Sequence, residues 1–104
     1  MDSAVIVLTT LGADADATAL ARTLVDEHLA ACVNVLPSMR SVYRWKGKVE
    51  EEREQQLLIK TSAARLDALK VRLAALHPYE TPELLVLDAA GSEAYLAWLD
   101  ESVS

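Results

Sequence analysis

The sequence contains little cysteine, glycine or proline, and each shortage excludes a class of protein. One cysteine among 104 residues cannot form a disulfide within the chain, so a reduced thiol in a cytoplasmic protein is the simplest expectation. Three glycines and three prolines, scattered along the chain, leave no linker, repeat or low-complexity segment. We therefore expect one globular domain over residues 1–104 with a modest hydrophobic core.

Basic residues are also scarce. The 16 acidic and 10 basic side chains give a formal net charge of −6. This charge argues against nucleic acid as a partner, because binding the phosphate backbone requires clustered lysine and arginine. The densest charge run, residues 50–54, is mostly acidic. Such a run either binds a cationic partner or lies on a face of the protein that is exposed to solvent.

Long apolar runs and catalytic motifs are missing as well. The apolar run over residues 4–8 is too short for a signal peptide or a membrane span, and residues 1–3 before it are not basic. We therefore expect no membrane partner. The sequence has no nucleophilic triad, paired-carboxylate spacing, phosphate-binding loop or dinucleotide motif, so nothing in it supports an enzyme and we expect none.

Apolar periodicity, in contrast, is strong at the start of the chain. Residues 4–10 are β-branched and apolar on both faces, which is typical of a central buried strand. Asp14 or Asp16 can cap a helix over 17–25, where apolar residues recur at helical spacing. His28 extends the same stripe, so we expect it to pack in the core or an interface.

A hairpin is expected in the middle of the chain. Residues 32–36 predict a second strand that Pro37 interrupts, which a strand tolerates only at an edge or bulge. Alternation resumes over 41–46, and Gly47 marks the turn. We predict one long strand over 48–61, because the turn supplies a partner strand and no helix cap or helical period supports a helix there.

The last part of the chain is expected to form a helix, a strand and a final short helix. Thr61 or Ser62 can cap the next helix, which carries a leucine stripe until Pro78 stops it. The stripe consists of Leu66, Leu69, Leu73 and Leu76. Residues 84–87 predict the fourth strand, and Ser92 can cap a short final helix. The order β-α-β-β-α-β plus a terminal helix predicts an α+β ferredoxin-like sandwich, with an antiparallel sheet and helices on one face.

The predicted hairpin is too long for its own sheet. A strand over 48–61 would span roughly 45 Å at about 3.3 Å per residue, against a radius of gyration of about 13 Å for such a domain. An isolated ribbon is marginally stable, and Tyr43 and Trp45 on one of its faces favour burial. We therefore expect an identical subunit to cover it, with Tyr95 and Trp98 of the final helix as a second interface element.

Five segments are distinctive in order and spacing across nearly the whole chain. They are 31–37 (ACVNVLP), 43–48 (YRWKGK), 58–61 (LIKT), 76–83 (LHPYETPE) and 95–98 (YLAW). Together they resemble the CutA family of divalent-cation tolerance proteins.

The resemblance implies a homotrimer of ferredoxin-like subunits, similar in architecture to the PII signalling proteins, with hairpins that wrap neighbouring subunits. It also implies a link to copper and other divalent cations. Copper binding in the family is associated with a cysteine near the end of the first strand and histidines just before the Pro-Tyr pair. This chain has Thr9 at the first position, and Leu76 followed by His77 at the second.

The segment 76–83 holds the candidate metal ligands. Its two prolines stiffen it, because each fixes its own φ and restricts the residue before it. His77 can ligate a divalent metal through an imidazole nitrogen, with Glu80 or Glu83 as an oxygen donor. The alternative is that His77 only ends a helix and hydrogen-bonds its last carbonyls.

Other side chains are candidates for a cleft between subunits. Cys32 can be a soft copper ligand, a nucleophile or a small buried hydrophobe. Lys60 can meet an anionic ligand or a carboxylate such as Glu83, or form a surface ion pair. The aromatic residues can line the cleft or serve packing. The cleft candidates are Cys32, Tyr43, Trp45, Lys60, Tyr79 and Trp98.

Three functions remain open at this point. The first is a cytoplasmic homotrimer that binds divalent cations, with copper favoured by the resemblance, and contributes to metal tolerance. The second is a PII-like sensor that binds a small anionic metabolite between subunits through Lys60 and Tyr79. The third is a scaffold for a partner protein.

Overall fold

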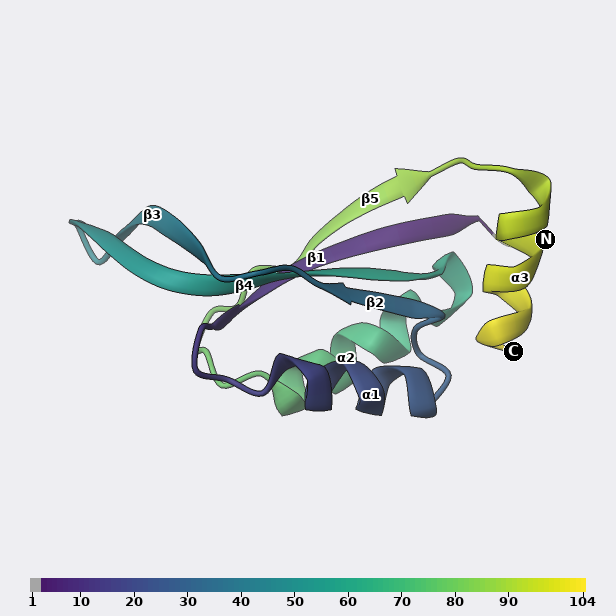
Figure 1. The fold of residues 1–104 in the computed structure, drawn as a ribbon, viewed down its shortest axis with the longest axis horizontal. Helices are drawn as coiled ribbons and strands as arrows, with labels where there is room; N and C mark the ends of the chain where they lie inside the picture. Colours follow the sequence, from purple (N-terminus) through teal and green to yellow (C-terminus); the bar gives the residue numbers. More distant parts are fainter. Residues whose placement is uncertain (1–2) are drawn as a thin grey trace.

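An antiparallel β-sheet with two helices packed against one face forms the body of the molecule (Figure 1). The computed structural model describes residues 3–104, so residues 1 and 2 of the expected domain lie outside it. The elements are β1 (Ala4–Gly12), α1 (Ala17–Asp26), β2 (Cys32–Val35), β3 (Met39–Trp45), β4 (Lys48–Ser62), a 3₁₀ turn (Ala63–Arg65), α2 (Leu66–Leu76), β5 (Leu85–Ala89) and α3 (Glu93–Ser102). No helix of the described residues has the length and apolar character needed to cross a membrane.

The sheet confirms the predicted ferredoxin-like α+β architecture. Its strand order is β2-β4-β1-β5, with β3 also paired to β4, and every pairing is antiparallel. Strands β2 and β3 are two pieces of one predicted strand, separated by residues 36–38 around Pro37. The strand predicted as the fourth is therefore the fifth, β5, and it begins at Leu85.

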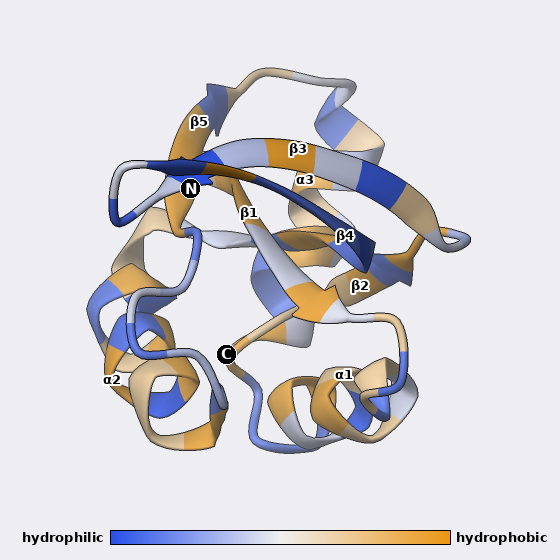
Figure 2. Ribbon diagram, turned by 90° about the vertical axis from the view of Figure 1, so that its left-hand side faces the viewer, coloured by the Kyte–Doolittle hydropathy of each residue, from blue (hydrophilic) through white to orange (hydrophobic). Residues whose placement is uncertain are grey.

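The hydrophobic core lies between the sheet and the two helices. Val7 of β1 and Ile59 of β4 lie directly opposite each other in the antiparallel register, and both are fully buried. Their partners in the core include Leu24 of α1 and Leu69 of α2. Figure 2 shows α1 and α2 side by side beneath the strands, so this face of the sheet is covered.

The long strand β4 is confirmed, and so is the overhang of its hairpin. Over Lys48–Glu54 the strand pairs with β3, whereas its pairing with β1 begins only at Glu54, opposite Gly12. The hairpin therefore extends past the end of β1, and the molecule measures 44 Å along its longest axis with a radius of gyration of 14.3 Å. At the tip, Lys46 and Gly47 have φ of 50° and 81°, as a two-residue type I′ turn requires.

The expectation that His28 extends the stripe of α1 is wrong. The helix ends at Asp26, and His28 lies beyond it with a left-handed φ of 59°. The His28 N–H donates to Val25 and the Leu29 N–H to Leu24, which is the Schellman pattern that ends a helix. Glycine is the usual residue at this position, so its absence hid the helix end from sequence analysis.

The predicted helix caps are confirmed at two of three sites. Asp16 Oδ1 accepts from the Ala19 N–H at 3.0 Å, and the Ser92 hydroxyl accepts from the Tyr95 N–H at 3.2 Å. The cap predicted at Thr61 or Ser62 is wrong, because a 3₁₀ turn follows Ser62 and its side chain makes no capping bond.

Candidate functional site

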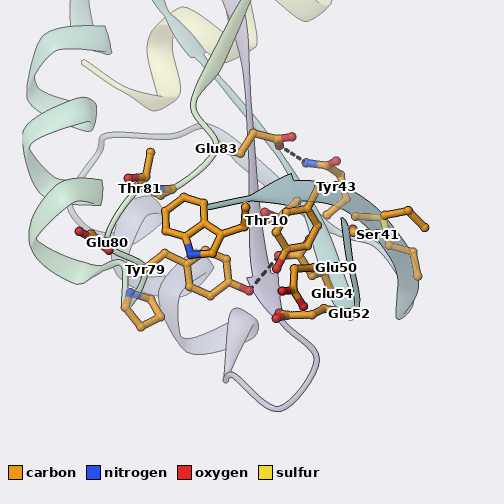
Figure 3. Close-up of a pocket in the computed structure, with 16 residues that line it drawn as sticks. Thr10, Ser41, Tyr43, Glu50, Glu52, Glu54, Tyr79, Glu80, Thr81 and Glu83 are labelled. Atoms are coloured by element: carbon orange, nitrogen blue, oxygen red, sulfur yellow. Dashed lines mark hydrogen bonds between the residues drawn. The ribbon is translucent and has the colours of Figure 1, made fainter. Parts of the chain in front are cut away.

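A groove of about 1020 Å³ lies between the inner face of the β3–β4 hairpin and residues 78–83, the segment that follows α2 (Figure 3). Among residues 3–104, no lysine, arginine or histidine lines it. Its carboxylates belong to Glu50, Glu52, Glu54, Glu80 and Glu83, and its aromatic rings to Tyr43, Trp45 and Tyr79. We call it the acidic groove.

Strand alternation explains why the hairpin is acidic and aromatic on one face. Successive side chains of a strand point to opposite faces, so the even-numbered residues of β4 share a side. In the antiparallel register Tyr43 lies opposite Glu50 and Ser41 opposite Glu52, which brings rings and carboxylates to the same face. The Lys46 ammonium at the tip lies 5.7 Å from the centroid of the Trp45 ring.

A hydrogen bond joins the two walls of the groove. The Tyr79 hydroxyl donates to Glu54 Oε2 at 2.8 Å, and Glu54 is only 7% exposed (Figure 3). A Cβ at Gly12 would lie 3.6 Å from this hydroxyl, so the end of β1 is also close to it. Burial raises the pKa of Tyr79 above its usual value, and the hydrogen bond and negative charge of Glu54 raise it further. The phenol therefore remains a donor to the carboxylate across the ordinary pH range.

Tyr43 also experiences the negative charge of the hairpin. Its pKa is raised, first by desolvation and then by the hydrogen bond and charge of Glu52. The raised pKa values of Tyr43 and Tyr79 have a common cause, because a second negative charge is unfavourable beside the glutamates. The groove accordingly favours cations over anions.

His77 points back into the fold. It is 8% exposed, its Nε2 lies 2.7 Å from the Thr10 carbonyl oxygen, and its Nδ1 accepts from the Tyr79 N–H at 3.1 Å. A carbonyl can only accept, so this network assigns the proton to Nε2 of a neutral imidazole. Both ring nitrogens are therefore engaged, and the side chain bonds to β1 rather than to the last carbonyls of α2.

The predicted ligands Glu80 and Glu83 line the groove, but they do not form a compact metal cluster with His77. Residues 3–104 contain no group of three or more His, Cys, Asp or Glu side chains arranged to hold a metal ion. Glu83 Oε2 accepts instead from Gln56 Nε2 at 2.9 Å, and the same amide nitrogen lies 2.8 Å from the Thr9 carbonyl oxygen. Of the alternatives that the sequence left open for Lys60, a contact with Glu83 is therefore not made within the described chain.

The six cleft candidates fall into two groups. Tyr43, Trp45 and Tyr79 meet in the acidic groove. Cys32 lies opposite Lys60 in the β2–β4 register, and the Lys60 ammonium is 6.0 Å from the centroid of the Tyr95 ring. The Cys32 thiol is free and half-buried.

Trp98 completes the second group through α3. Its ring packs on Tyr95 with centroids 5.3 Å apart. Sequence analysis missed two members of these groups, Tyr95 as the neighbour of Lys60 and Glu54 as the partner of Tyr79. The strand alternation that placed Tyr43 and Trp45 on one face could have found Glu54, since it lies on the same face of the hairpin.

The strand order, the overhanging hairpin and the groove beneath it define a PII-like ferredoxin fold. The chain is similar to the PII-like protein CutA from Nostoc sp. PCC 7120, with 37% identity, a TM-score of 0.89, and coverage of 96% of this chain and 97% of that one. It is also similar to the divalent cation tolerance protein Cut A1 from Thermus thermophilus, with 45% identity, a TM-score of 0.90, and coverage of 95% and 97%.

The sequence comparisons lead to one family. The divalent-cation tolerance protein CutA of Pectobacterium atrosepticum is 48% identical over 101 residues, which cover 96% of this chain and 92% of that protein. The model of the CutA1 divalent ion tolerance protein family matches residues 5–102. The chain therefore belongs to the CutA1 divalent ion tolerance protein family, as the sequence segments predicted.

Proposed function

We propose that this protein binds divalent cations in the acidic groove and contributes to metal tolerance as a cytoplasmic homotrimer. The observation that carries the proposal is the lining of the groove, with five glutamates and no basic side chain among the described residues. Carboxylate oxygens are ligands for divalent cations, and the names of its relatives concern divalent-cation tolerance. The function we favour is non-enzymatic.

The donor set bears on which metal fits. A site made only of Glu50, Glu52, Glu80 and Glu83 would suit a hard cation or zinc, because carboxylates are hard ligands. Copper favours imidazole nitrogen, and His77 is the histidine nearest to these carboxylates in sequence. For His77 to ligate through Nδ1, the Tyr79 N–H that now donates to this nitrogen must move away. The predicted set His77, Glu80 and Glu83 therefore requires a local rearrangement of the loop.

The trimer is supported by apolar side chains on the surface of the single chain. Leu85 and Leu87 on the edge strand β5 are 55% and 50% exposed. Both sheet edges, β5 on one side and β2 with β3 on the other, have no further strand among residues 3–104. Unpaired edges and exposed apolar side chains are features that association buries.

An organic ligand between subunits is the second candidate. The expected anionic metabolite would need Lys60 and Tyr79 together, and within one chain these residues lie in different groups. Such a pocket would therefore need two subunits. The scaffold function finds support only in the same exposed apolar side chains, since nothing in the described chain selects a partner protein.

Calorimetric titration of metal-free protein with copper, zinc and manganese separates these possibilities. We expect saturable binding that a Glu50→Gln/Glu52→Gln variant weakens, because the variant removes two carboxylates and little volume. Glu101→Gln on the exposed side of α3 is the matched control and should bind as the wild type does. A His77→Ala variant that loses copper but retains zinc would assign the imidazole to copper. Equal binding by the wild type and the Glu50→Gln/Glu52→Gln variant would refute the groove as the metal site.

A further inference from the structure

A second, smaller pocket lies at the end of the molecule opposite the hairpin. It has a volume of about 290 Å³, and it forms where the end of β4, the 3₁₀ turn and the end of α3 meet. Figure 1 shows α3 and the tip of the hairpin at the two ends of the long axis, so this pocket is separate from the acidic groove. We call it the α3 pocket. Its lining consists of Ser62, Ala64, Arg65, Asp100, Val103 and Ser104.

Hydrogen bonds to the main chain hold the α3 pocket in shape. The Arg65 Nε–H donates to the Val103 carbonyl oxygen at 2.6 Å, which joins the 3₁₀ turn to the end of α3. The Ser104 hydroxyl donates to the Asp100 carbonyl oxygen at 2.8 Å, and His28 Nδ1 lies 3.1 Å from the main-chain oxygen of Ser104. Val103 is 2% exposed, so its side chain anchors this end of α3 in the fold. The pocket is therefore formed within a single chain.

Two opposite charges line the pocket without contacting each other. Within residues 3–104 the single ion pair joins Arg72 and Glu27, so Arg65 and Asp100 do not pair. Arg65 uses Nε for its hydrogen bond, and the N–H groups of both Nη atoms have no acceptor among the described residues. Asp100 contacts Ser104 through its main-chain oxygen, and its carboxylate accepts no hydrogen bond from the described chain. Both charges are therefore available to a ligand.

A buried hydroxyl without a partner opens into the same pocket. Ser62 is 2% exposed, and its hydroxyl makes no hydrogen bond to the described residues. Among the buried and half-buried residues of the described chain, Thr61 Oγ1 is the only side-chain nitrogen or oxygen that is both shielded from solvent and unpaired. The Ser62 hydroxyl therefore still reaches solvent, and it does so through the pocket that it lines. A hydroxyl buried in this way is unfavourable unless water or a ligand bonds to it.

We propose that the α3 pocket binds a free α-amino acid as its zwitterion. A ligand with one charge pairs with Arg65 or with Asp100 and leaves the other unpaired beside it, whereas a zwitterion satisfies both. The guanidinium donates to the α-carboxylate, and the Asp100 carboxylate accepts from the α-ammonium. The Ser62 hydroxyl donates to the ligand carboxylate. This site goes beyond the proposed cation site in the acidic groove and does not depend on it.

The size of the pocket limits the side chain of the ligand. At about 30 Å³ per molecule, a volume of about 290 Å³ corresponds to roughly ten waters, which is the space that a small amino acid needs. Ala64 and Val103 supply the apolar part of the lining. We therefore expect alanine, serine or threonine to bind more tightly than tryptophan or arginine.

Chemical-shift mapping tests the inference residue by residue. Each standard amino acid is titrated singly into ¹⁵N-labelled protein, and the amide signals of residues 62–65 and 99–104 are followed. We expect saturable shifts in these two segments with a small amino acid, and no shifts in the hairpin. The methyl ester of the bound amino acid lacks the carboxylate, and its N-acetyl derivative lacks the ammonium. Each derivative should bind at least about tenfold more weakly, because it loses the hydrogen bonds of one charged group.

Variants separate binding from a structural role. Ser62→Ala removes a hydroxyl that has no partner in the fold, so it should weaken amino-acid binding about fivefold without lowering stability. Asp100→Asn and Arg65→Gln should each weaken binding at least about tenfold. Arg65→Gln also loses the bond to Val103, so the other two variants suffice if it fails to fold. Arg22→Gln on the exposed side of α1 is the matched control and should bind as the wild type does.

Three results would overturn the inference. The first is the absence of saturable shifts around the α3 pocket with every standard amino acid at tens of millimolar. The second is a methyl ester or N-acetyl derivative that binds as tightly as the amino acid, because one charge would then suffice. The third is unchanged binding in Asp100→Asn and Ser62→Ala. The Glu50→Gln/Glu52→Gln variant should bind amino acids as the wild type does, so failure of the metal site and failure of this inference can be told apart.

Discussion

The contact between Tyr79 and Glu54 offers the most precise test of the groove. Replacing Tyr79 by Phe removes one oxygen atom and keeps the ring, whose centroid lies 4.8 Å from that of His77. The loss leaves a carboxylate that is 7% exposed without the donor at 2.8 Å. A hydrogen bond to a charged group contributes about 1.5–3 kcal/mol, so we expect the free energy of unfolding to fall by about 2 kcal/mol.

The assay is equilibrium denaturation at neutral pH and fixed protein concentration, because association would make the midpoint concentration-dependent. Tyr95→Phe is the matched control, since its hydroxyl makes no hydrogen bond within the described residues and should cost less than about 0.5 kcal/mol. A change of less than about 0.5 kcal/mol in Tyr79→Phe would mean that water replaces the phenol and that the walls of the groove are not joined.

Three further predictions follow from the contacts described above. The pKa of the Tyr79 phenol is raised in the folded state. The stability that this phenol contributes is therefore complete below about pH 10, and it declines as the pH rises from there towards the folded-state pKa. In denaturation experiments across pH, Tyr79→Phe should lack this alkaline decline. Asp16→Ala should lower the free energy of unfolding by about 1 kcal/mol, because it removes the N-cap of α1, and Asp16→Asn should retain most of the stability in the same assay. Arg72→Ala should cost less than about 1 kcal/mol and less still in high salt, because its ion pair with Glu27 at 2.8 Å is well exposed; a cost of several kcal/mol would show that this pair is structural.

The sequence was sufficient for elements whose signals are local. The strand β4 followed from the turn at Gly47, the alternation of Tyr43 and Trp45, and the lack of a helix cap, and its overhang followed from length alone. Proline at position 37 correctly marked the break between β2 and β3. Each of these features depends on residues a few positions apart, which is where sequence patterns are informative.

The sequence was insufficient where a side chain depends on a distant partner. The imidazole of His77 is held by the Thr10 carbonyl, and Glu54 by Tyr79, across 67 and 25 positions of sequence respectively. No local pattern distinguishes a histidine that ligates a metal from one that bonds to a strand carbonyl. The helix end at His28 was missed for another reason, because a residue with a side chain occupies the left-handed position that glycine usually marks.

The sequence could predict the position of some cleft candidates but not of others. Tyr43, Trp45 and Tyr79 do lie together in the acidic groove, but sequence could not reveal that Lys60 and Trp98 lie at the other end of the sheet. Their separation is a property of the strand register. The chain has to be folded before these residues divide into two groups.

Anomalous diffraction from crystals grown with zinc or copper is the most direct test of the proposed cation site. The account predicts a strong anomalous peak in the acidic groove, about 2.0–2.2 Å from carboxylate oxygens that include Glu50 or Glu52. Peaks confined to other surfaces of the molecule, with the groove free of metal at saturating concentration, would contradict the central claim.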